Sequence, residues 1–193
     1  MPPSQHLDDA LRTDQESETV DFKTSLDVNV KSELLEVVKD IIAMANSGGG
    51  VLLVGVNDDG RPSGHDVSGL LNFDPAKMSN QLFAATGRHF CTFRITAAER
   101  GTHTIAAVEV GGVPVPLVTV AAGNYHDPHT GRQKTAYSQG VVYFRHGAKS
   151  EPGTTEDLER FLKREIEAVR ESWLSNLRRV AEAPLEAVMH YEP

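Results

Sequence analysis

The chain has 193 residues, a formal net charge of −8 at pH 7 and 39% hydrophobic residues. This length and hydrophobic content suit one domain, or one domain with an appendage. Since no apolar run approaches about 20 residues, the sequence excludes a membrane span. The acidic N-terminal segment has no apolar stretch of the secretory type, and the single cysteine, Cys91, excludes an intrachain disulfide, so we expect a cytoplasmic location.

The N-terminal part predicts a lead-in followed by one strand. Residues 1–15 are polar and acidic, which is typical of a loose or partly helical segment. Val20 and Phe22 then alternate with Asp21 and Lys23, and a period of two residues indicates a half-exposed strand. On such a strand Asp21 and Lys23 share one face.

A helix is predicted next, because apolar residues recur at steps of three or four from Leu34 to Ala45. Ser32 is its expected cap, since a serine hydroxyl accepts a hydrogen bond from a first-turn amide. The three glycines at 48–50 are expected to end the helix, because glycine enters the left-handed region without steric cost. This glycine run follows a helix rather than preceding one, so it predicts a turn and not a phosphate-binding loop.

Residues 51–56 form an apolar run rich in β-branched side chains, which predicts a central strand buried on both faces. Residues 57–60 (Asn-Asp-Asp-Gly) predict a turn after it. That turn places the carboxylates of Asp58 and Asp59 at a strand end, where ligands collect in α/β proteins.

The second half predicts shorter elements and one long helix. In chain order they are a helix within residues 69–87 capped by Asp74, strands at 91–97, 103–110 and 115–120, a long polar loop at 123–140, a strand at 141–144, and a closing helix at 155–182. The first two of these strands are expected to form an antiparallel hairpin. The pattern predicts an α/β (α+β) fold, a mixed β-sheet with a buried central strand flanked by helices. It divides into a lead-in (1–15), a domain (16–153) and a C-terminal helix with a tail (154–193).

The closing helix carries an apolar stripe that stays near a seven-residue repeat from Leu162 onward. One interpretation is that the stripe packs on the sheet. The other is that part of the helix protrudes and pairs with a second copy, which would bury Trp173 and Leu177 at a two-fold axis and make a homodimer.

Acidic side chains at two strand ends are candidate metal ligands. Glu16, Asp21 and Asp58, with Asp59 as a further candidate, could hold one or two Mg²⁺ or Mn²⁺ ions. Such ions activate water and stabilise charge in phosphodiester cleavage. The alternative is that these acids are solvated and that Asp58 and Asp59 serve only the turn.

Basic residues gather in the second half although the whole chain is acidic. The set that could position a phosphate backbone includes Lys23, Arg132, Lys134, Arg145 and Lys149. Tyrosines lie among these residues and could stack on bases. The alternative is ordinary surface charge, which would scatter over the molecule.

Three segments resemble the Schlafen AlbA_2 domain over about residues 14–165. They are E-S-x-x-x-D-F-K at 16–23, I-A-M-A-N-S-G-G-G-V-L-L-V-G-V-N-D-D-G at 42–60, and Y-F-R-H-G at 143–147. The resemblance implies an α/β domain that binds nucleic acid. In the better-understood Schlafen members it further implies a metal-dependent endoribonuclease acting on structured RNA such as tRNA.

Carried over residue by residue, the resemblance implies that Glu16, Asp21 and Asp58 hold Mg²⁺ or Mn²⁺ at the scissile phosphate, with Lys23 beside them to stabilise developing charge. Arg145 and Lys149 would position the backbone, together with Arg132 and Lys134. The sequence departs from the family at two positions. Asp21 stands where glutamate is usual, and Asn57 stands where an acid is common, which leaves Asp58 or Asp59 as the third acid.

Three functional hypotheses follow from the sequence. The first is a Schlafen-like nucleic-acid-binding domain that is a metal-dependent endoribonuclease, with RNA favoured over DNA. The second is a non-catalytic DNA- or RNA-binding regulatory module that dimerises. The third is a scaffold domain, which fits the net negative charge best.

Overall fold

The computed structural model describes residues 5–89, 92–127 and 130–182. The chain divides into two compact units, one up to Thr154 and one from Thr155 onward. The predicted strand at 91–97 begins outside the described residues, and its described part is longer than expected. None of the described helices is both long and apolar enough to cross a membrane.

The first unit is built on a four-stranded mixed sheet with the strand order β1-β2-β4-β3. Its strands are β1 (Val20–Lys23), β2 (Gly49–Val54), β3 (Phe93–Arg100) and β4 (His103–Gly111). β1 runs parallel to β2, whereas β2 and β3 are both antiparallel to β4. The predicted mixed sheet and the predicted β3–β4 hairpin are therefore confirmed.

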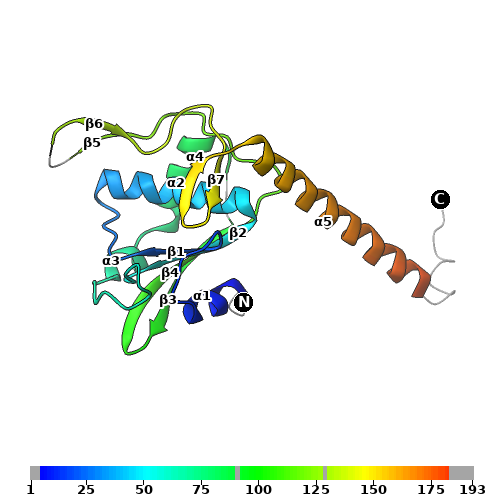
Figure 1. Cartoon of the computed structure of the whole chain (residues 1–193), viewed down its shortest axis with the longest axis horizontal. Helices are drawn as coiled ribbons and strands as arrows, with labels where there is room; N and C mark the ends of the chain where they lie inside the picture. Colours follow the sequence, from blue (N-terminus) through cyan, green and yellow to red (C-terminus); the bar gives the residue numbers. More distant parts are fainter. Residues whose placement is uncertain (1–4, 90–91, 128–129, 183–193) are drawn as a thin grey trace. The chain divides into compact units, whose positions relative to one another are not determined.

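Helices flank this sheet, and two small hairpins follow it in the chain (Figure 1). The helices of the first unit are α1 (Gln5–Arg12), α2 (Lys31–Ser47), α3 (Ser68–Leu71) and α4 (Pro75–Thr86). The hairpins are β5 (Asn124–His126) with β6 (Gln133–Thr135), and β7 (Tyr143–His146) with β8 (Lys149–Pro152). The second unit contains α5 (Thr155–Glu182).

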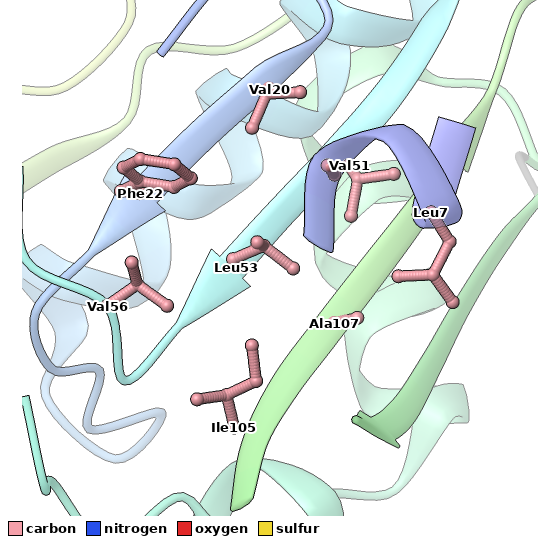
Figure 2. Packing of buried hydrophobic residues seen from close by; sticks show 9 residues of the cluster. Leu7, Val20, Phe22, Val51, Leu53, Val56, Ile105 and Ala107 are labelled. Carbon is pink, nitrogen blue, oxygen red and sulfur yellow. The ribbon is translucent and has the colours of Figure 1, made fainter. Parts of the chain in front are cut away.

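The predicted lead-in is partly a helix, and this helix contributes to the core. Leu7 and Ala10 of α1 are buried together with side chains of β1, β2 and β4. Figure 2 shows Leu7 near Val51 and Ala107 in this cluster. The guanidinium of Arg100 donates a hydrogen bond to the carbonyl of Ala10 (3.3 Å), which fastens the end of α1 to the sheet.

The central strand is buried along its whole length, as its apolar run predicted. It begins earlier than expected, because Gly49 and Gly50 belong to β2 and only Gly48 caps the preceding helix. A Cβ on Gly50 would stand 2.7 Å from the carbonyl oxygen of Thr19, and one on Gly49 would stand 2.7 Å from that of Val110. These glycines therefore permit neighbouring backbones to approach closely.

Two local predictions differ from the structure. α2 begins at Lys31 after Val30, so Ser32 lies inside the first turn and is not the cap. The segment 115–120 is not a regular strand and contributes only the isolated bridge between Val118 and Val142. Pro114 and Pro116 explain this difference, because proline has no amide hydrogen for a strand ladder. The predicted cap of α4 is confirmed, since the amide of Ala76 donates to Asp74.

Asn46, near the end of α2, joins this helix to two distant segments. Its side-chain amide donates to the carbonyls of Leu117 (3.1 Å) and Tyr143 (2.9 Å), and its Oδ1 accepts from the amide of Leu117 (2.7 Å). Asn46 is fully buried, so these backbone groups have no access to water if the side chain is removed.

Replacing Asn46 tests this role. We expect Asn46→Ala to lower the free energy of unfolding by about 2–3 kcal/mol, because it leaves buried backbone donors and acceptors without a hydrogen-bond partner. Urea unfolding followed by circular dichroism measures the change, with Asn80→Ala at an exposed position of α4 as the control. Equal stability of the two variants would contradict the assignment.

Candidate functional site

β1 places Asp21 and Lys23 side by side, as the alternation in the sequence predicted. The Nζ of Lys23 lies 2.8 Å from Oδ2 of Asp21. It also lies 3.1 Å from Oδ2 of Asp40, an acidic residue on the buried side of α2. One ammonium group therefore bridges carboxylates that come from a strand and a helix.

Arg145 of β7 closes this arrangement from the other side. Its Nη2 lies 2.9 Å from Oδ1 of Asp21, and its Nη1 lies 3.9 Å from Oδ1 of Asp40. Ser150 of β8 donates to the same Oδ1 of Asp40 (2.7 Å) and accepts from Arg145 (3.2 Å). We call Asp21, Lys23, Asp40, Arg145 and Ser150 the charge cluster.

The charge cluster lies almost entirely inside the protein. The side chains of Asp21 and Arg145 are 2% and 1% exposed, whereas that of Lys23 is 32% exposed. Two carboxylates face two cations, so the cluster is neutral as a whole. Because isolated buried charges are costly, this pairing is what allows the guanidinium of Arg145 to be buried.

The environment shifts two pKa values in the cluster. Burial and the neighbouring carboxylate of Asp40 raise the pKa of Asp21, although Lys23 and Arg145 act in the opposite direction. Burial alone would lower the pKa of Lys23, but the carboxylates of Asp40 and Asp21 outweigh burial and raise it. Lys23 is therefore held in its charged form.

The three predicted metal ligands lie in different settings. The carboxylate of Glu16 accepts from the amide of Phe22 (2.7 Å) at the edge strand β1. Asp21 is in the charge cluster, and Asp58 is exposed in the turn after β2. Asp59, the alternative third acid, is also exposed and accepts from the amide of Arg61.

The acids as placed do not fit a metal ion. Among the residues that the structure describes, no three Asp, Glu, His or Cys side chains are gathered in a way that could hold one. Both oxygens of Asp21 already face cationic groups, those of Arg145 and Lys23. The metal role of Glu16, Asp21 and Asp58 thus stays a prediction, and we derive no chemical step from it.

The predicted nucleic-acid-binding residues separate into three places. Arg132 and Lys134 are exposed on or beside the β5–β6 hairpin, where Lys134 pairs with the buried carboxylate of Asp127. Lys149 is exposed in the β7–β8 hairpin. Arg145 is inside the charge cluster, where its guanidinium is buried and pairs with Asp21.

A groove lies between the first turn of α2 and the β5–β6 hairpin. Figure 1 shows the β5–β6 hairpin next to that end of the helix. Its volume is about 560 Å³, and its lining includes Lys31, Ser32, Tyr125, His126 and Gln133. A second hollow of about 380 Å³ lies beside Lys23 and Asp40 and is lined by acids and lysines alike. The first groove has the more basic lining.

Sequence reasoning did not single out Asp40, Ser150 or Lys31. A signal for Asp40 exists, because this acid stands between Val37 and Ile41 on the apolar face of a predicted helix. A charged residue in that position is buried only when it is paired. Ser150 and Lys31 carry no comparable signal.

Removing the buried cation tests the charge cluster. We expect Arg145→Met to lower the free energy of unfolding by about 3–5 kcal/mol, because two buried carboxylates then share only Lys23. Adding Asp21→Asn should recover part of this loss by removing one uncompensated charge. Denaturant unfolding of both variants, with the exposed Arg88→Met as the control, measures the effect. If the second substitution makes the loss larger, the pairing is not as described.

The raised pKa of Lys23 predicts a pH dependence. The contribution of Lys23 to the free energy of unfolding is complete below its ordinary pKa of 10.5 and disappears as the pH rises through the raised value. Lys23→Met should therefore be less stable than the wild type near neutral pH, and the difference should shrink in strongly alkaline solution. Lys39→Met, which removes a lysine paired with Glu36, serves as the matched control. A difference that grows with pH would refute the expected sign.

Comparisons with known proteins place this chain in a family. The model of the family described as Schlafen, AlbA_2 matches residues 16–154. No curated protein matches the chain. One similar solved structure is the DIP2311 protein from Corynebacterium diphtheriae, with 18% identity, a TM-score of 0.48, and coverage of 80% of this chain and 31% of that one. This chain thus spans about a third of the length of that relative.

Another solved structure is the N-terminal domain of a protein described as ATP-dependent DNA helicase RecG-related, from Nitrosomonas europaea. It has 21% identity and a TM-score of 0.34, and the alignment covers 77% of this chain and 90% of that one. Because both TM-scores lie below 0.5, neither structure carries an argument about this chain. The family model, which matches well over half of the sequence, shows that the chain belongs to the Schlafen AlbA_2 family.

Proposed function

We propose that this chain is a homodimeric nucleic-acid-binding module that prefers RNA to DNA. The observation that carries the proposal is the groove between α2 and the β5–β6 hairpin, with Lys31, Tyr125 and His126 in its lining. Membership of the Schlafen AlbA_2 family supports the same conclusion. The partner of the groove would be the sugar–phosphate backbone of a single-stranded or looped segment.

The groove offers positive charge in a protein that is acidic overall. Lys31 is exposed in the groove lining, and the exposed Arg132 directly precedes the lining residue Gln133 in the chain. The acid of the first turn, Glu33, is turned to the preceding segment, where it accepts from the amide of Asp27 (2.7 Å). Local charge near the groove therefore differs in sign from the net charge of −8.

The first turn of α2 adds to this local charge. Val30, the residue before the helix, has no side-chain oxygen that could cap the first amides. A helix of 17 residues also carries a partial positive charge at this end. Both features favour a phosphate group beside Lys31.

The aromatic ring of Tyr125 favours RNA with unpaired bases. Tyr125 is half-buried in β5, opposite Lys134 in β6. Proteins that recognise looped or single-stranded RNA stack its bases on such rings and hold its phosphates with neighbouring cations. In the groove, Tyr125 would supply the ring and Lys31 the cation.

Cleavage is a separate question from binding. The endoribonuclease activity on structured RNA such as tRNA that the resemblance implies needs Glu16, Asp21 and Asp58 around Mg²⁺ or Mn²⁺. Since the described acids do not gather in this way, the proposal is for binding without cleavage.

The binding experiment compares charge reversals at two places. We expect Lys31→Glu and Arg132→Glu each to weaken binding of a tRNA transcript by about tenfold. The slope of the logarithm of the binding constant against the logarithm of the salt concentration should also fall, by about the amount that one phosphate contact contributes. Arg61→Glu, at a highly exposed site in the turn after β2, is the matched control and should change little. Fluorescence anisotropy with tRNA and single-stranded DNA over a range of salt concentrations provides both quantities.

Three results would change the assignment. Absence of binding to either nucleic acid at low salt would favour the scaffold hypothesis. An equal loss in Arg61→Glu would place the interface outside the groove. Cutting of tRNA with Mn²⁺ or Mg²⁺ that disappears in Asp58→Asn, a substitution at an exposed site, would establish the ribonuclease and overturn binding without cleavage.

A further inference from the structure

α5 carries a continuous row of exposed apolar side chains. The exposed fractions are 41% for Leu158, 58% for Leu162, 66% for Ile166, 55% for Val169, 70% for Trp173 and 65% for Leu177. We call these six residues the α5 stripe. A row of this kind on a water-soluble helix is typical of a surface that a partner covers.

The spacing of the α5 stripe is an eleven-residue repeat. From Leu158 the steps are four, four, three, four and four residues, and a further step of three reaches Val180. From Leu162 onward the same residues also lie near the seven-residue repeat that the sequence suggested, and including Leu158 extends the pattern to eleven residues. An eleven-residue repeat corresponds to about 3.67 residues per turn, close to that of a straight α-helix. The stripe therefore runs along the helix with little drift and suits a long, nearly straight partner helix.

We propose that the α5 stripe pairs in parallel with the α5 stripe of a second copy of this chain. This inference rests on the homodimer of the proposed function and adds its interface and orientation. A helix with the same repeat is the partner that matches the stripe along its whole length, and a second copy provides one by definition.

Charges beside the stripe select the parallel orientation. At about 98° per residue, Glu165 lies about 65° to one side of the line through Leu162 and Trp173, and Arg170 lies about 65° to the other. In a parallel pair, a flanking residue faces the residue five positions later on the opposite flank of the partner helix. Glu165 then faces Arg170 of the partner subunit, and the two-fold axis repeats this ion pair.

An antiparallel pair would bring equal flanks together. If the two helices overlap along their full length, they are aligned around Val169, and Arg170 would lie near Arg170 of the partner subunit, which is repulsive. Within one chain both side chains already have surface partners, since Nη1 of Arg170 is 3.5 Å from a carboxylate oxygen of the exposed Glu167 and Nε of Arg164 is 3.0 Å from Oε1 of Glu165. Such surface pairs rearrange at little cost.

Trp173 provides a direct signal for this interface. It is the single tryptophan of the chain and is 70% exposed. In the parallel pair each stripe residue lies beside the same residue of the partner helix. The two Trp173 indoles would therefore become buried against each other. We expect a shift of the emission maximum to shorter wavelength as the full-length chain is concentrated, in step with the dimer fraction from sedimentation.

The first experiment disrupts the stripe in the full-length chain. Ile166→Asp should weaken dimerisation by about 100-fold, because it places a carboxylate in the paired surface. Ala168→Asp changes an exposed residue on another face of the same helix and should leave dimerisation unchanged. Ile166 is exposed in one chain, so circular dichroism should show both variants folded. A wild type that is monomeric at all concentrations, or equal effects of both substitutions, would overturn the inference.

The second experiment tests the orientation. Glu165→Arg and Arg170→Glu should each weaken the dimer by about fivefold, and the two together should restore it. In a Cys91→Ser background, Leu177→Cys should form a disulfide with its own copy, because only a parallel pair brings this position near the helix end together with itself. No restoration and no disulfide in a chain that still dimerises would overturn the parallel orientation.

The experiments distinguish a failure of the α5 pairing from a failure of the proposed nucleic-acid binding. A chain that dimerises through the α5 stripe but does not bind nucleic acid overturns the nucleic-acid proposal and leaves this inference intact. A chain that binds tRNA as a monomer overturns this inference and the proposed homodimer, and leaves the proposed nucleic-acid binding intact.

Discussion

The buried guanidinium of Arg145 is the constraint on which the first unit depends. A cation that is 1% exposed must be neutralised where it lies, and its neutralising partners are Asp21 and Asp40. These acids come from β1 and α2, while Arg145 comes from β7, so three segments far apart in the sequence must meet before any of them is buried favourably. Asn46 reinforces the same junction by holding the carbonyl of Tyr143. The last hairpin is thereby part of the domain rather than an appendage.

Family motifs in this chain have structural explanations that do not require catalysis. In the first motif, Glu16 accepts a hydrogen bond from the amide of Phe22 in the edge strand β1, and Asp21 and Lys23 belong to the charge cluster. In the second, Asn46 binds backbone groups of two segments, and Gly50 leaves room for the carbonyl of Thr19. A match to these motifs therefore shows that the fold is shared. The metal role that the resemblance implies would further need three acids at one place, and no such group is found among the described residues.

The sequence predicted what depends on local periodicity and missed what depends on distant contacts. The buried strand β2, the helix α2 and the Asp74 cap follow from residues within a few positions of one another, and all are present. The charge cluster depends on pairing between residues more than a hundred positions apart, so Arg145 looked like a surface cation. The strand expected at 115–120 was wrong, because Pro114 and Pro116 have no amide hydrogen for a strand ladder and only the bridge from Val118 to Val142 forms.

The proposed binding of nucleic acid by an acidic chain needs an explanation, and the proposed α5 pair supplies one. In the proposed parallel pair the two Thr155 residues lie at the same end, so the pair links two copies of the first unit. Each unit contributes one groove with few cations, and one such groove holds few phosphates. When two grooves are linked, the second contact becomes intramolecular, and the overall affinity exceeds that of either groove without any new contact. Weak local attraction in each unit is then sufficient, and the net charge of −8 limits attachment to chains that cannot engage both grooves.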